Sequence, residues 1–176
     1  MDFGFSEEQD LLRQGVRKFL DEQSPMGEVR RAMETPAGYL PELWKQLAEL
    51  GWLGLTIPEA HGGAGLGWID LLVLLEETGR SLFPSPLLST TLAAATILDA
   101  GSEAQRERWL PGLADGSRIG TLALLEESDV LDPSGVRLRG ERRGRGFVLD
   151  GEKRFVPDAS AANPLRRGLP DGPCRG

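Results

Sequence analysis

Few side chains in this sequence could carry acid–base chemistry. His61 is the only histidine, and it stands in a glycine-rich stretch with no serine, cysteine or carboxylate pair around it. Histidine titrates near neutral pH, so a proton-transfer role is one interpretation. A catalytic role also needs a nucleophile or an orienting partner, and none is evident. We therefore interpret His61 as an incidental loop residue.

Adjacent glutamates, Glu76 and Glu77, are the next candidates, because paired carboxylates can divide acid and base roles. Neighbouring positions on a helix point in different directions, so we expect a solvated or capping role for both. One histidine and one cysteine, Cys174, are too few for a His/Cys metal site, and none is predicted. A lone cysteine forms no disulfide within the chain, which is typical of a reducing compartment.

A glycine-rich loop and an arginine cluster could each bind phosphate. Residues 62–67 lack the lysine and hydroxyl residue of a P-loop, so we interpret them as a turn between helices. The arginines could meet a ligand phosphate, because guanidinium pairs well with phosphate. A solvated hairpin edge that discourages strand aggregation is an equal alternative. The cluster comprises Arg137, Arg139, Arg142, Arg143 and Arg145.

Apolar periodicity predicts an all-helical region over residues 1–118. Ser6 with Gln9 and Ser102 with Gln105 both fit capping boxes at helix starts. The first helix should end near residue 23, and weaker helical character follows over residues 25–34. Further helices are expected over residues 41–50, 68–80 and 86–100, and from 102 to about 111. The helix over 68–80 is apolar on most sides, so we expect it to be buried.

After residue 118 the pattern changes to extended chain. Residues 120–125 are typical of a strand, residues 136–139 alternate, and residues 147–149 and 153–156 predict a hairpin around Asp150 and Gly151. This partial β region covers residues 119–162. Residues 163–176 are rich in proline and glycine without periodicity, so we interpret them as an irregular, frame-shifted tail. The β region thus begins without the further strands that a stable sheet needs.

Composition narrows the function classes. The chain has 176 residues, 40% of them hydrophobic, and a net charge of −7. Such a charge disfavours nucleic acid and anionic membranes as partners. No apolar run is long enough for a membrane span, and the start lacks the pattern of a secretory signal. A cytoplasmic protein is the default expectation.

Several stretches occur in an order and spacing that resembles the acyl-CoA dehydrogenase family. They are residues 43–52, 58–65, 76–80, positions within 101–116, and residues 146–153. The resemblance covers about residues 3–162. It implies a mainly α fold with a short β region: an N-terminal helical domain over residues 1–118, followed by an incomplete, β-barrel-like middle domain over residues 119–162.

Members of this family bind FAD and oxidise the Cα–Cβ bond of an acyl-CoA, and pass electrons to an electron-transfer flavoprotein. A glutamate in or near the C-terminal domain removes the α proton. The sequence stops before that domain, so the resemblance assigns no catalytic residue, and we expect the chain to be inactive alone. Fatty and sterol acyl groups both stay open as substrates, and so do homo- and hetero-oligomeric states.

The resemblance also places cofactor-binding positions at Leu124, Leu125, Ser128, Phe155 and Pro157. Phe155 matches the aromatic residue that lies against the flavin. Leu125 stands where the family has a threonine, and Pro157 where it has a hydroxyl residue near flavin N5. Neither side chain can donate a hydrogen bond, and proline also lacks the backbone donor. We therefore expect weakened flavin binding.

Two other functions are compatible with this pattern. The chain could be a non-catalytic module that docks on a full-length dehydrogenase and completes a composite flavin site. It could also belong to a flavin monooxygenase of the same fold. The four tryptophans are interpreted as core or interface residues: Trp44, Trp52, Trp68 and Trp109.

Overall fold

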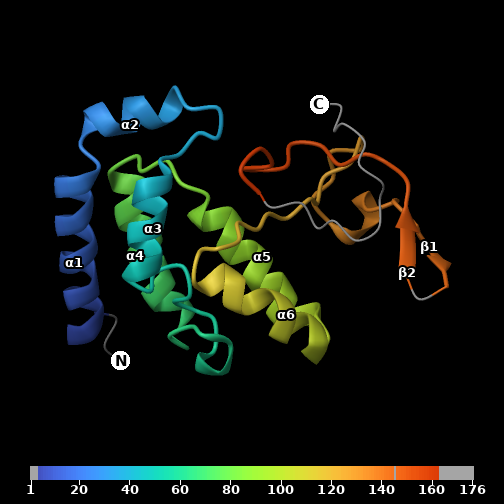
Figure 1. Ribbon diagram of the computed structural model, residues 1–176, viewed down its shortest axis with the longest axis horizontal. Helices are drawn as coiled ribbons and strands as arrows, with labels where there is room; N and C mark the ends of the chain where they lie inside the picture. Colours follow the sequence, from blue (N-terminus) through green and yellow to red (C-terminus); the bar gives the residue numbers. More distant parts are fainter. Residues whose placement is uncertain (1–3, 145, 163–176) are drawn as a thin grey trace.

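The structure, a computed structural model, describes residues 4–144 and 146–162. Helices form the larger part, and a strand hairpin lies at the end far from α1 (Figure 1). In chain order the elements are α1 (Glu7–Gln23), α2 (Met26–Met33), α3 (Pro41–Glu49), the 3₁₀ turn η1 (Glu59–His61), α4 (Trp68–Arg80), α5 (Leu87–Ala100), α6 (Glu103–Ala114), the 3₁₀ turn η2 (Pro133–Gly135), β1 (Gly140–Arg143) and β2 (Gly146–Leu149). The prediction of a mainly helical chain with a short β region is confirmed.

Local signals place the helix starts. The Ser6 hydroxyl accepts from the Gln9 N–H at 3.2 Å, and the Gln9 side chain accepts from the Ser6 N–H at 3.0 Å. At the start of α6, the Gln105 side chain accepts from the Ser102 N–H at 2.8 Å. The end predicted for α6 was one turn short, because the helix continues through Pro111. Its last turn buries Leu113 and Ala114, which stabilises the extension.

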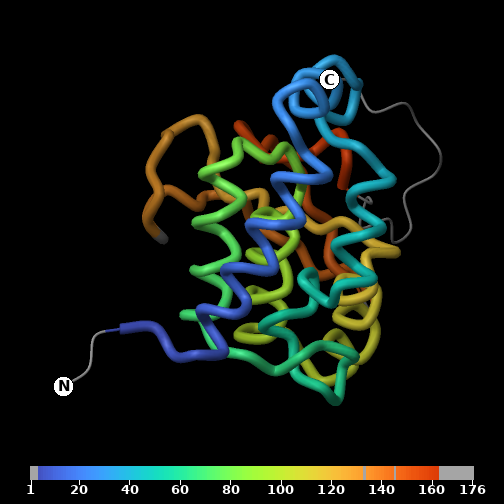
Figure 2. Tube along the Cα trace, turned by 90° about the vertical axis from the view of Figure 1, so that its left-hand side faces the viewer, coloured from blue at the N-terminus to red at the C-terminus, as the bar shows by residue number. Residues whose placement is uncertain are grey.

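The main core lies between α1, α3 and α4. Figures 1 and 2 both show α1 lying beside α4. Val16 and Leu20 of α1 pack with Leu47 of α3 and Leu74 of α4, and all four are at most 1% exposed. A smaller cluster joins α5 and α6 and includes Ile57, Ala94, Leu110, Leu113 and Ala114. In the described residues, no helix is both long and apolar enough to cross a membrane.

Glu77 departs from the solvated role that we expected, because its side chain is only 1% exposed. Arg17 of α1 donates to both of its carboxylate oxygens, at 3.0 and 2.6 Å. Arg80 donates to it at 2.8 Å and also reaches Asp21 at 2.9 Å. The hydrogen bond from Arg17 is the main cause that lowers the pKa of Glu77 to about 2. The neighbouring Glu76 side chain is 55% exposed, as expected.

The prediction that α4 is buried on most sides is wrong. Leu71, Val73 and Leu74 are buried, whereas Trp68, Ile69 and Leu72 are 62%, 57% and 56% exposed. α1 packs on α4, and the buried residues of α4 share a core cluster with residues of α3. An apolar face of α4, made of Trp68, Ile69 and Leu72, therefore stays open to solvent.

The strand predictions are corrected in part. Residues 147–149 do lie in a strand, but β2 pairs antiparallel with the preceding β1, from Gly140 opposite Leu149 to Arg143 opposite Gly146. Residues 153–156 form no strand, because Phe155 has a left-handed φ of 49° that breaks an extended ladder. Residues 120–125 and 136–139 also form no strand. The predicted frame-shifted tail, residues 163–176, lies outside the described residues.

Candidate functional site

Two segments that the sequence assigned to a cofactor lie side by side. Residues 121–126 run antiparallel to residues 153–157, although the two form no regular ladder. The Thr121 hydroxyl donates to the Pro157 carbonyl at 2.6 Å, and the Arg154 N–H donates to the Leu125 carbonyl at 2.9 Å. The Lys153 ammonium donates to the Leu124 carbonyl at 3.0 Å. The fold therefore brings Leu124, Leu125 and Pro157 into one small region.

Glu126 fixes this region in place. Its carboxylate accepts from the Lys153 ammonium at 2.8 Å and from the backbone N–H groups of Arg137 and Leu138 at 2.8 and 3.0 Å. These bonds, the one from Lys153 foremost, lower the pKa of Glu126 to about 2. A charged Glu126 thus ties three separate segments together near neutral pH.

The aromatic at position 155 points away from the protein. The Phe155 side chain is 82% exposed, and Leu124 nearby in this region is 38% exposed. Each offers apolar surface against which a flat ring system could lie. The backbone N–H groups of residues 125–128 have no acceptor among the described residues. Free amide donors beside an apolar surface suit a heterocycle that carries carbonyl oxygens.

Ser128 lies in the next turn, apart from this surface. Its hydroxyl donates to the Gly135 carbonyl at 3.3 Å. With Arg137 and Arg154 it lines a separate cavity of about 470 Å³ between the loops. Arg154 already pairs with Glu152 at 2.8 Å in this cavity. Guanidinium and hydroxyl groups bind phosphate oxygens, but Glu126, Glu127 and Glu152 also line this cavity and their carboxylates oppose an anion.

The other arginines of the sequence cluster lie at the hairpin. Arg139, Arg142 and Arg143 are exposed, and Arg143 pairs with Glu141 at 3.5 Å on the same strand. Arg145 lies outside the described residues. Arg139, Arg142 and Arg143 therefore form a solvated edge of the hairpin, which was one of the two interpretations. Of the described arginines of the cluster, only Arg137 lines the cavity beside Ser128.

His61 and Glu76 lie in the helical part, away from this region. His61 ends the turn η1, between α3 and α4. Glu76 faces solvent and pairs with Arg13 at 2.9 Å. No cluster of three or more potential metal ligands occurs within residues 4–144 and 146–162. None of these residues combines with another into an acid–base pair.

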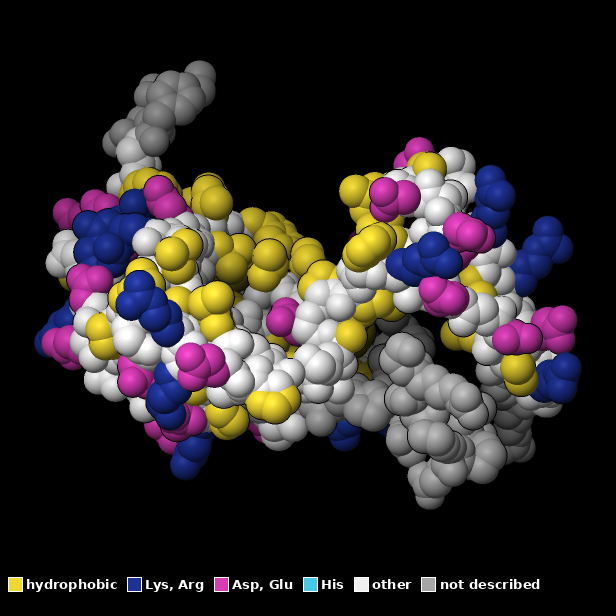
Figure 3. Space-filling view, turned by 90° about the horizontal axis from the view of Figure 1, so that it is seen from above, with side chains coloured by type: hydrophobic (Ala, Val, Ile, Leu, Met, Phe, Trp, Pro, Cys, Tyr) yellow, Lys and Arg dark blue, Asp and Glu magenta, His cyan; other side chains and the backbone are white. Residues whose placement is uncertain are grey.

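Sequence reasoning missed a stripe of leucines on α5. Leu88 and Leu92 are 53% and 42% exposed, one helical turn apart. The same helix reaches the β-containing part through Ser89, whose hydroxyl donates to Asp158 at 2.6 Å. Figure 3 shows hydrophobic side chains on both sides of a hollow between the helical part and the hairpin part. The spacing of the two leucines indicates a shared face, but not that this face stays uncovered.

Comparison with known proteins agrees with this architecture. The model of the acyl-CoA dehydrogenase N-terminal domain matches residues 6–117. Mitochondrial isovaleryl-CoA dehydrogenase of Pongo abelii is 37% identical over 184 residues, which cover 94% of this chain and 43% of that protein. A variant of the Tcur3481-Tcur3483 steroid ACAD superposes with a TM-score of 0.81 at 38% identity, covering 89% of this chain and 43% of that one.

A glutaryl-CoA dehydrogenase from Mycobacterium smegmatis, solved in complex with FADH2, superposes with a TM-score of 0.77 at 30% identity. That match covers 90% of this chain and 41% of the other. The chain therefore spans less than half the length of these relatives. The matched N-terminal domain and the shared fold show that the chain belongs to the acyl-CoA dehydrogenase family.

Proposed function

We propose that this chain forms the N-terminal helical domain, residues 1–118, and the flavin-side start of the middle domain, residues 119–162, of an FAD-dependent acyl-CoA dehydrogenase. The reaction would oxidise a CH–CH bond of an acyl-CoA in the cytoplasm and pass electrons to an electron-transfer flavoprotein. The observation that carries this proposal is the pairing of residues 121–126 with residues 153–157, beside which the backbone N–H groups of residues 125–128 have no acceptor among the described residues. The relative solved with FADH2 supports the choice of cofactor.

The residues present fit a flavin in part. Phe155 and Leu124 would lie against the ring system, and the amides of residues 125–128 would donate to its carbonyl oxygens. Ser128 and Arg137 are the groups in the neighbouring cavity that could donate to phosphate oxygens, although the three glutamates of its lining make the fit poor there. Bound FAD supplies the hydride acceptor. Leu125 and Pro157 contribute no side-chain donor, so the affinity of this chain for FAD is expected to be low.

The acyl group would lie along the exposed leucines of α5. Leu88 and Leu92 offer an apolar surface on the helix that bonds to the flavin-side segment through Asp158. An acyl chain that lies on these leucines is removed from water, which contributes a favourable free energy of about 25 cal/mol per Å² of apolar surface buried. The two leucines would orient the acyl chain of the substrate. The base that abstracts the proton has to come from outside the described residues.

Two measurements on the purified chain test the proposal. Its absorption spectrum after incubation with FAD and gel filtration should show little retained flavin. Acyl-CoA oxidation, followed with an artificial electron acceptor, should be absent. Robust turnover by the chain alone would contradict the expected dependence on a base from outside the described residues.

A non-catalytic partner module is a second candidate. The open apolar face of α4, with Trp68, Ile69 and Leu72, favours it, because exposed contiguous apolar surface marks interaction sites. In this case a full-length acyl-CoA dehydrogenase should co-purify with the chain and raise its flavin content. Replacing Leu72 by aspartate should abolish that complex, whereas Glu76→Gln on the same helix should leave it intact. A complex that tolerates Leu72→Asp would exclude this face.

A further inference from the structure

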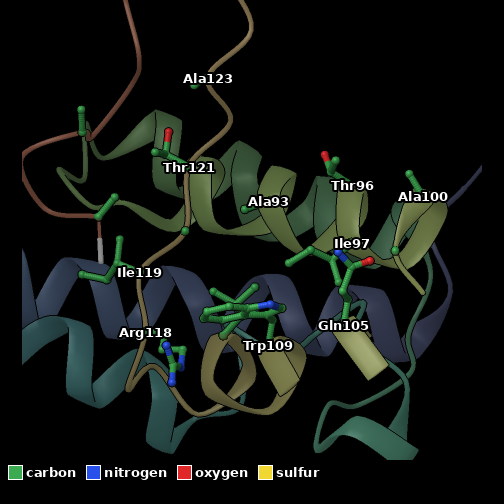
Figure 4. Close-up of a pocket in the computed structure, with 15 residues that line it drawn as sticks. Ala93, Thr96, Ile97, Ala100, Gln105, Trp109, Arg118, Ile119, Thr121 and Ala123 are labelled. Atoms are coloured by element: carbon green, nitrogen blue, oxygen red, sulfur yellow. The ribbon is translucent and has the colours of Figure 1, made fainter. Parts of the chain in front are cut away.

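An apolar cavity of about 560 Å³ lies between α5, α6 and the chain that leaves α6. Figure 4 shows its wall: Ala93 and Ile97 come from α5, Trp109 from α6, and Ile119 and Thr121 from the connection beyond α6. Small residues line much of the remainder, including Ala123 and Ala159. A cavity of this size, with mostly apolar walls, suits a small organic molecule.

Arg118 lies at the edge of the cavity. The Arg118 guanidinium lies 4.8 Å from the centroid of the Trp109 ring, and Arg108 lies at the same distance from that ring. Neither arginine forms an ion pair within the described residues. Gln105 also lines the wall, and its side-chain amide N–H groups have no acceptor there. The polar groups at the edge are therefore donors without acceptors.

We propose that this cavity binds an amphipathic carboxylic acid. The apolar body would lie on Trp109 and Ile97, and the carboxylate would pair with Arg118 at the mouth. An anion needs such a local cation, because the chain as a whole carries a charge of −7 and repels anions at long range. Thr96 is exposed and lines the cavity, so a ligand can enter without unfolding α5.

This site is distinct from the flavin-side region of the proposed function. It shares one segment with it: Thr121 and Ala123 line the cavity, and Leu124 and Leu125 follow them in the chain. An acyl-CoA thioester has no free carboxylate on its acyl carbon, so a carboxylate at that carbon can pair with Arg118 only in the free acid. Binding here requires neither FAD nor turnover.

Trp109 provides a direct readout. Bromodecanoic acid, whose bromine quenches tryptophan on contact, should quench the fluorescence of the purified chain saturably. Trp109→Phe should remove the quenching, and Trp68→Phe, at the exposed face of α4, should keep it. Quenching that survives in Trp109→Phe and disappears in Trp68→Phe would place the acid on α4 and overturn the proposal.

Two further variants test the assigned contacts. Arg118→Gln should weaken decanoate binding about tenfold and leave decanol binding unchanged, because only the acid carries a charge for the guanidinium. Thr96→Phe should block both ligands by filling the mouth, with an unchanged circular dichroism spectrum as its folding control. Equal losses for acid and alcohol in Arg118→Gln, or no saturable quenching in the wild-type chain, would overturn the site. Failure of FAD binding would leave these outcomes unaffected.

Discussion

Replacing Glu77 by glutamine removes the charge that joins α1 to α4. Arg17 and Arg80 hold the buried carboxylate from two helices and lower its pKa from 4.5 to about 2. A pKa difference of this size corresponds to about 3 kcal/mol of stability at neutral pH. We expect Glu77→Gln to lower the free energy of unfolding by about that amount, because both guanidinium groups then lack the anion that they share. Urea unfolding, followed by far-UV circular dichroism, measures the loss.

The same carboxylate predicts a pH dependence. Its pKa is lower in the folded state, so its stabilisation is complete above the unfolded value of 4.5 and disappears as the pH falls toward 2. The wild-type chain should therefore lose its advantage over Glu77→Gln between about pH 5 and pH 2. Glu76→Gln is the matched control, because Glu76 is exposed and should cost about 0.5 kcal/mol or less. A Glu77→Gln variant as stable as Glu76→Gln at neutral pH would refute the reasoning.

Other substitutions test the flavin-side region and the glycine loop. Leu125→Thr combined with Pro157→Thr adds two hydroxyl groups at the flavin-side positions, and should raise FAD affinity at least about tenfold in a flavin fluorescence titration; unchanged affinity would remove both residues from the proposed site. Gly63→Ala would place a Cβ 2.0 Å from the Ile57 carbonyl oxygen, so we expect a loss of about 3 kcal/mol in thermal or urea unfolding. Gly27 lies in open space on α2, so Gly27→Ala should instead stabilise the protein by about 0.5–1 kcal/mol. Equal effects of Gly63→Ala and Gly27→Ala would mean that the loop around Gly63 is not close-packed.

Helix ends could be predicted because their signals are local. Ser6 and Gln9 satisfy each other within one turn, and Gly51 adopts the left-handed φ of 74° expected of a helix cap. Both signals depend on residues within a few positions. Neighbouring sequence was therefore enough to place the boundaries of most helices.

Features that depend on distant partners were not predictable in the same way. The burial of Glu77 follows from Arg17, which lies 60 residues earlier in the chain. Residues 120–125 have the composition of a strand but form no ladder, because a strand exists only where a second one pairs with it. The turn at Asp150 and Gly151 was a local signal too, but no strand follows it, because Phe155 has a left-handed φ of 49°.

The family resemblance was needed to relate Leu125 to Phe155, because nothing in their own spacing brings them together. The structure places their segments next to each other through bonds from Thr121, Lys153 and Arg154. Their flavin contacts stay a prediction. The cavity beside Trp109 left no sequence signal, since its wall is built from four separate segments of the chain.

The hairpin has two unequal edges. β1 carries Glu141, Arg142 and Arg143, whereas β2 carries Phe147 and its apolar neighbours, with Phe147 72% exposed. Within the described residues the sheet ends at each of these strands. Charged side chains oppose the addition of a further strand, and apolar ones permit it. Any growth of this sheet, whether by a partner chain or by self-association, is therefore directional and proceeds from β2.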